Sequence, residues 1–113
     1  MDLIELLQRL ALNDEHAVRL AIGAATAPRA GAALDGRTNA LVQLAALLSL
    51  GAATCSCRVA VEVARTHGAT DAELVGVLVA VAPALGGAGV VAAAPRLARA
   101  IDHDVEAWDA PPR

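Results

Sequence analysis

The chain has 113 residues with a formal charge of −3, and 57% of them are hydrophobic while 1% are aromatic. One domain of this length buries a modest fraction of its surface, so the apolar surplus favours self-association and predicts a homo-oligomer. The nine basic residues are arginines scattered from Arg9 to Arg113 without a cluster, which argues against nucleic acid as a partner.

The N-terminal third is expected to hold two helices. Residues 2–12 place leucines on one stripe of a first helix. A second helix begins after Asn13 or Asp14, either of which can cap it, and its pattern fades near Thr26. A loop to about Ala33 follows.

Two further helices are predicted in the middle of the chain. Asp35 has the position of an N-cap for a helix that is apolar on nearly every side and ends at Gly51, which can supply a left-handed stop. After a connection over residues 52–55, either Thr54 or Ser56 starts the next helix, which ends at Gly68.

The C-terminal third begins with the clearest local signal of the chain. Thr70 and Glu73 have the spacing of a capping box, in which each side chain accepts a hydrogen bond from the other residue's amide. The helix that follows is expected over residues 71–82, stopped or bent by Pro83, and a last helix is expected over 95–101. No strand-like alternation appears, so the fold class is all-α.

A long uncharged segment raises the question of a membrane. Leu74–Pro95 has no charged residue and is long enough to span a bilayer. Pro83 and three glycines interrupt it, and alanine contributes little to insertion. We therefore expect two buried helices and no membrane, with a small membrane protein as the alternative. Residues 1–5 lack the basic start of a secretory signal, which favours a cytoplasmic location.

Three stretches of the middle of the chain form a recognisable pattern: residues 45–51 and two motifs, Leu34-Asp35-Gly36-Arg37-Thr38-Asn39-Ala40-Leu41-Val42 and Gly68-Ala69-Thr70-Asp71-Ala72-Glu73-Leu74. On these residues, more than half of the sequence resembles the carboxymuconolactone decarboxylase and alkylhydroperoxidase D-like family. The resemblance implies a small helical bundle around a central helical hairpin, with one domain over 1–113 and a core over 34–101. It also implies assembly into trimers or hexamers, with active sites near the subunit interfaces.

The residues that carry chemistry in that family are replaced here. Redox members have Cys-x-x-Cys before the Gly-Ala-Thr motif, a His one turn later and a Glu on the preceding helix. Counting back from Gly68 places these positions at Ala53, Ser56 and Ala60, with the Glu near residues 40–41. None of the four matches, so the resemblance implies a member with a degenerate active site.

The decarboxylase branch of the family keeps the His and adds polar groups on the next helix, with a Tyr-x-Gly-x-Pro stretch. In this chain only the glycine of that stretch is retained, as Gly86. The other places read Ala60, Gly76, Ala80, Ala84 and Ala88. Peroxidase and decarboxylase activities are therefore both in question, and whether the protein is an enzyme stays open.

The remaining candidates lie beside the family's active position. Cys55 and Cys57 are the catalytic candidates, because a thiol at the first turn of a helix has a lowered pKa; the alternative is that both are small buried hydrophobes. Ser56, Arg58 and Gly86 are the candidate ligand-binding residues. Arg58 could bind a carboxylate, or form an exposed ion pair instead.

No metal or cofactor site is expected, since the histidines lie far apart in the sequence and none shares a helix face with a second ligand at metal-binding spacing. The sequence thus predicts a helical oligomer that binds a small molecule or has a structural role. The alternatives are a thiol-dependent peroxidase or disulfide reductase using Cys55 and Cys57, or a decarboxylase with a rearranged site.

Overall fold

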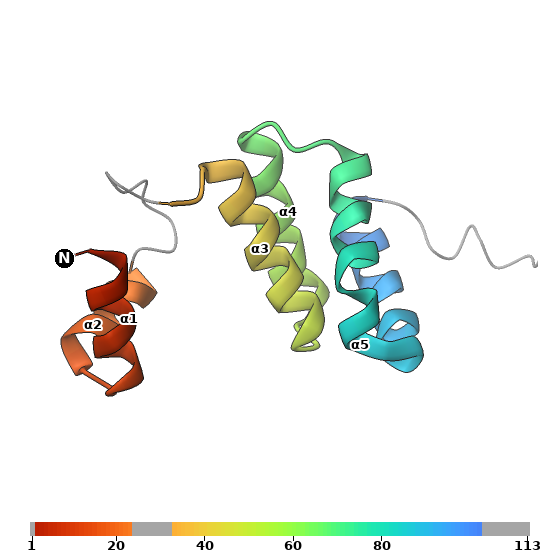
Figure 1. The fold of residues 1–113 in the computed structure, drawn as a ribbon. Helices are drawn as coiled ribbons and strands as arrows, with labels where there is room; N and C mark the ends of the chain where they lie inside the picture. The colour runs from red at the N-terminus through yellow and green to blue at the C-terminus, as the bar shows by residue number, and fades with distance from the viewer. Residues whose placement is uncertain (1, 24–32, 103–113) are drawn as a thin grey trace, which may run out of the picture. The chain divides into compact units, whose positions relative to one another are not determined.

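The protein is described by a computed structural model over residues 2–23 and 33–102. This part of the chain contains five α-helices and no strand (Figure 1), as the all-α prediction requires. Its contacts group into two units, Met1–Ala33 and Leu34–Arg113, each of which is described by itself. The boundary between them lies where the predicted core over 34–101 begins.

The first unit is a short helical hairpin, named here the N-terminal hairpin. Its helices are α1, Leu3–Ala11, and α2, Glu15–Gly23. The side chain of Asp2 caps α1 by accepting from the amide of Glu5 at 2.7 Å. Asp14 does the same for α2, accepting from the amides of His16 and Ala17. The predicted end of the second helix near Thr26 lies outside the described residues.

The second unit, here called the core unit, begins with two packed helices. They are α3, Gly36–Ser49, and α4, Thr54–Thr66. As predicted, Asp35 caps α3, with its carboxylate 2.7 Å from the amide of Thr38, and Gly51 follows the helix with a φ of +74°. Of the two predicted starts for α4, the structure has Thr54, preceded by Ala53, which gives no side-chain cap.

Helix α5, Asp71–Ala100, begins at the predicted capping box. The amide of Glu73 donates to Thr70 Oγ1 at 3.1 Å, and the amide of Thr70 donates to Glu73 Oε1 at 3.0 Å. Of the two effects predicted for Pro83, a stop or a bend, the stop is wrong, because the helical conformation continues to a break at Gly86, with φ +76° and ψ +170°. The predicted helix start at Pro95 is wrong as well, because Pro95 lies inside the second half of α5.

The break at Gly86 folds α5 back on itself (Figure 1). The contacts of Arg65 show that the two ends of α5 lie close together. Its Nη2 lies 2.9 Å from Asp71 Oδ1 at the start of α5 and 3.4 Å from the carbonyl oxygen of Ile101 just past its end. A straight helix of 30 residues would hold those ends about 45 Å apart.

By length and composition α5 is the one described helix that could cross a membrane. As folded, its two halves are each about 22 Å long, which is shorter than the ~30 Å hydrocarbon core of a bilayer. The uncharged segment forms two antiparallel pieces that pack on α3 and α4. Only 11% of its most apolar 18 residues are buried, so the expectation of two buried helices is wrong for the single subunit.

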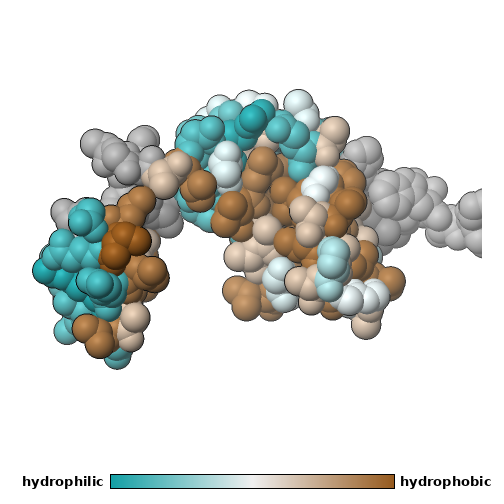
Figure 2. Space-filling view, in the orientation of Figure 1, coloured by the Kyte–Doolittle hydropathy of each residue, from teal (hydrophilic) through white to brown (hydrophobic). Residues whose placement is uncertain are grey.

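The core of this unit consists of small and branched aliphatic side chains from α3, α4 and α5. Leu44, Leu48, Val61 and Leu74 are completely buried or nearly so, and several alanines fill the spaces between them. Much apolar surface is left over, as Figure 2 shows on the visible face. The large apolar side chains that stay exposed in the core unit are Leu34, Val42, Leu50, Val59, Val63, Val75, Val79 and Val91.

The two capping carboxylates should make stability depend on acid. The amide of Thr38 lowers the pKa of Asp35, and the amide of Thr70 with nearby Arg37 lowers the pKa of Glu73. Since both pKa values are lower in the folded than in the unfolded chain, these groups stabilise the fold above their unfolded pKa values, and that contribution is lost as the pH falls through the folded values.

The test is the urea midpoint of unfolding measured from pH 7 down to pH 3. The D35N/E73Q variant keeps oxygen acceptors at both caps and removes the two titrations. We expect its midpoint to fall less steeply below pH 5 than that of the wild type. Parallel curves for the two proteins would contradict this assignment.

Candidate functional site

The two predicted catalytic cysteines lie in the first turn of α4 and point to opposite sides of it. Cys55 is exposed, whereas Cys57 is completely buried. Residues two apart in a helix diverge in this way, so a Cys55–Cys57 disulfide is incompatible with a helix that begins at Thr54, and both thiols are free. The structure therefore does not place them as a redox pair.

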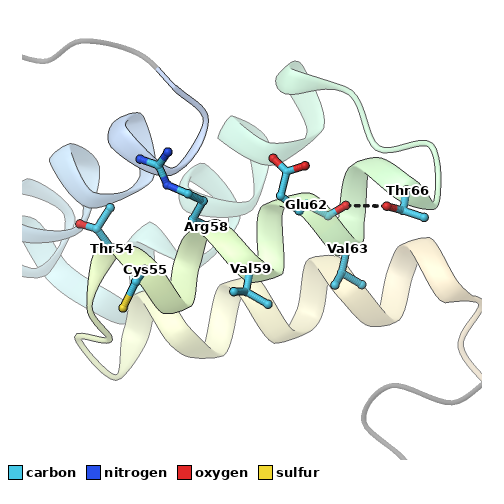
Figure 3. A pocket seen from close by; sticks show the side chains of 7 residues that line it. All are labelled: Thr54, Cys55, Arg58, Val59, Glu62, Val63 and Thr66. Carbon is cyan, nitrogen blue, oxygen red and sulfur yellow. Dashed lines mark hydrogen bonds between the residues drawn. The ribbon is translucent and has the colours of Figure 1, made fainter.

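A shallow open hollow runs along the outer face of α4, with a volume of about 630 Å³. It is named here the α4 hollow, and its lining comes from this helix alone: Thr54, Cys55, Arg58, Val59, Glu62, Val63 and Thr66. In Figure 3, Arg58 and Glu62 lie along one edge, while Cys55, Val59 and Val63 lie along the other. The hollow thus has an apolar edge, a charged edge and no second wall.

Of the predicted site residues, Cys55 and Arg58 come together in this hollow. The other lining residues were not identified from the sequence, although their three- and four-residue spacing after Cys55 places them on one helix face. Ser56 is exposed on α4 but is not part of the lining. Gly86 lies at the break in α5 and is not part of the lining either.

Arg58 is held by the end of α5. Its Nη1 lies 2.9 Å from Asp102 Oδ1, and its Nη2 donates to the carbonyl oxygen of Arg99 at 2.8 Å. The guanidinium satisfies a carbonyl of the last turn of α5 and places positive charge at the negative end of the helix dipole. Of the two interpretations of Arg58, the exposed ion pair is the one the structure contains.

The environment of Cys57 disfavours its thiolate. Burial raises the pKa of the Cys57 thiol, and the nearby Arg96 only partly opposes this. The Sγ lies 3.9 Å from the carbonyl oxygen of Ala52, a contact in which the thiol is the weak donor. Since the thiolate is the reactive form, Cys57 is arranged as a packed side chain rather than as a nucleophile.

Arg96 was not identified from the sequence. It extends from the second half of α5 to the turn after α3, where its Nη1 would lie 3.6 Å from a side chain added at Gly51. Its Nε is buried and has no hydrogen-bond partner in residues 2–23 and 33–102. Nothing local marks this residue, because the contact joins positions about 45 apart in the sequence.

The position that the family resemblance assigns to a catalytic His is packed. Ala60 is 7% exposed and belongs, with Cys57, to the buried cluster formed by α3, α4 and α5. The described residues contain no group of three metal-ligating side chains. The arrangement offers an exposed thiol and an arginine on a surface, with no proton acceptor identified beside the thiol.

Comparison with known proteins gives one match. The sequence model of the carboxymuconolactone decarboxylase family matches residues 15–100, which is most of the chain. Searches of curated proteins and of solved structures found no significant similarity. The match begins with the first residue of α2 and ends with the last residue of α5, so it covers four of the five described helices and leaves out α1. The chain therefore belongs to the carboxymuconolactone decarboxylase family.

Proposed function

We propose that this protein is a cytoplasmic, homo-oligomeric member of its family with a degenerate active site, and that its role is structural rather than redox. The observation that carries the proposal is the burial of Ala60, the position that the resemblance assigns to the catalytic His, in the aliphatic core beside Cys57. An alanine packed there supplies neither a proton acceptor nor room for a substrate, which favours a scaffold over an enzyme.

The exposed apolar surface supports assembly, and the family resemblance is the reason to expect a trimer or hexamer. The core unit exposes eight large aliphatic side chains, and the N-terminal hairpin exposes five more while burying Ala17 alone among its described residues. Contacts with other copies would remove this area from water, and burying apolar area is the main source of association free energy.

A second candidate function is the binding of a small molecule in the α4 hollow. The specific observation in its favour is the pairing of an apolar edge with Arg58, whose guanidinium has donors beyond the two bonds to Asp102 and Arg99. Such a surface suits an apolar carboxylate. The hollow is open, so this function also needs a neighbouring subunit to close it.

The redox alternative depends on Cys55, the exposed thiol. It requires that Cys57 resolve an oxidised Cys55, yet the two side chains leave the helix on opposite sides. We expect iodoacetamide to label Cys55 in the native protein near neutral pH and to label Cys57 only after unfolding. A reversible disulfide between them, found by mass spectrometry, would support the alternative instead.

The preferred function is tested by measuring the mass of the assembly in solution and the enzymatic turnover of the wild type and variants. Light scattering after size exclusion should give three or six subunits of 11.4 kDa. Peroxide consumption with a dithiol reductant, and decarboxylation of a muconolactone carboxylate, should be the same for the wild type and for C55S. Turnover that a single substitution in the α4 hollow abolishes would overturn the structural role, and a monomer would overturn the assembly.

A further inference from the structure

We propose that the α4 hollow is covered by the α4 helix of a second copy of this chain, packed antiparallel around a two-fold axis that crosses the outer face of α4 at the level of residue 60. This inference deepens the proposed assembly and rests on its hexameric form, because a two-fold axis requires an even number of subunits and a trimer has none. It identifies the surface through which two subunits meet and the register in which the two helices lie.

The first argument is the missing wall of the hollow. All seven lining residues belong to one helix, so none of the other described residues of the core unit, 34–102, closes the hollow. Val59 is 65% exposed and Val63 is 40% exposed at its centre. A helix face with apolar side chains at this spacing is the kind of surface that another helix covers, with the ridges of one lying in the grooves of the other.

The second argument is the order of charges along the edge. Arg58 precedes Glu62 by one turn, and both lie on the same edge of the α4 hollow (Figure 3). In an antiparallel pair centred near residue 60, Arg58 of each copy lies level with Glu62 of the other copy. The pairing therefore occurs twice in one dimer. A parallel pair would instead set the charged edge of each copy beside the apolar edge of the other, so opposite charges meet in the antiparallel direction alone.

The contacts that Arg58 and Glu62 make within one subunit leave both side chains able to form an ion pair with a second copy. Arg58 uses Nη1 and Nη2 for Asp102 and Arg99, which is two of its five N–H donors. Glu62 has only a long contact of 3.4 Å to Arg65, and its side chain is 62% exposed.

The same register places Cys55 of one copy within about one residue of the level of Thr66 of the other. Both residues line the α4 hollow, near its two ends along the helix. Within one helix they are 11 residues and therefore about 16 Å apart, and Cys55 lies about 15 Å from its symmetry mate along the axis. A short crosslinker can therefore join Cys55 to position 66 between copies but not within one chain.

The test uses T66C with the native Cys55 and a short bismaleimide, with V79C as the control. Val79 lies on α5 and its side chain is 67% exposed, a fraction close to the 65% of Val59 in the α4 hollow. We expect T66C to give covalent dimers in most of the protein, whereas the wild type and V79C give few. Crosslinking of the wild type to the same extent would show a parallel pair through Cys55 and would overturn the register.

A second measurement uses V59D and V79D, whose helical content should match the wild type by circular dichroism. V59D should reduce the mass of the oligomer, measured by light scattering at 10 µM protein, by at least half. V79D should leave that mass unchanged. An oligomer that resists V59D, with T66C uncrosslinked, would overturn the α4 pairing while leaving the proposed assembly intact. A monomeric wild type would overturn the assembly and the pairing together.

Discussion

Replacing Leu74 by alanine should destabilise the core unit more than any other truncation of a single side chain to alanine proposed for this protein. Leu74 is completely buried in the first half of α5 and belongs to the cluster that joins it to α3 and α4. Removing its branched end leaves a cavity that neighbouring alanines cannot fill, and such changes cost about 2–5 kcal/mol. Domains of this size have only about 5–15 kcal/mol of stability in all.

The matched control is L50A, the same chemical change at a leucine that is 82% exposed after α3. It should alter the free energy of unfolding by no more than about 0.5 kcal/mol. Urea unfolding followed by circular dichroism, at one protein concentration for all variants because assembly contributes to stability, measures both. Equal effects of L74A and L50A would mean that the core is not packed around α5 as described.

The sequence predicted those features of the fold that depend on neighbouring residues. Asp35 and the pair of Thr70 and Glu73 were identified as caps because a cap needs only a side chain and an amide three residues away. These interactions form with little help from the rest of the chain, so a local pattern is enough to find them.

The turn in α5 was misplaced because the sequence contains two signals for it. Pro83 lacks an amide and opposes a helix through it, and this suggested an end at residue 82. The structure instead retains the helix past Pro83 and turns at Gly86, where the required torsion angles are open to glycine. Whether the chain turns at Pro83 or at Gly86 depends on where the second half of α5 packs. Its packing depends in turn on α3 and α4, which are distant in the sequence.

In the candidate site too, local features were predicted from the sequence and long-range contacts were not. The sequence identified Cys55 and Arg58, but it could not show that Arg58 and Arg65 hold the end of α5, because those contacts span 36 to 44 positions. Nor could it show that Cys57 faces the core and Cys55 the solvent, since periodicity gives their relative direction and not which side is covered. Long-range packing decides both.

Replacing Gly86 by alanine should have the second largest effect, and Gly87 supplies a close control. A side chain added at either glycine would meet no atom within 4 Å, so space is equal at the two positions. The difference is the backbone, since Gly86 has a φ of +76° with a ψ of +170°, a region that other residues scarcely enter. G86A should therefore cost about 1–3 kcal/mol, whereas G87A should be neutral or stabilise by up to ~1 kcal/mol.

The consequence of G86A should reach the far end of α5, because the break is what returns Ile101 to Arg65. If the first half of α5 straightens to relieve the strain, the carbonyl of Ile101 moves away from Arg65, and amide hydrogen exchange should rise over residues 96–101 as well as around the break. G87A should leave exchange in both places as in the wild type. Equal unfolding free energies for G86A and G87A would mean that the torsion at Gly86 does not hold the two halves of α5 together.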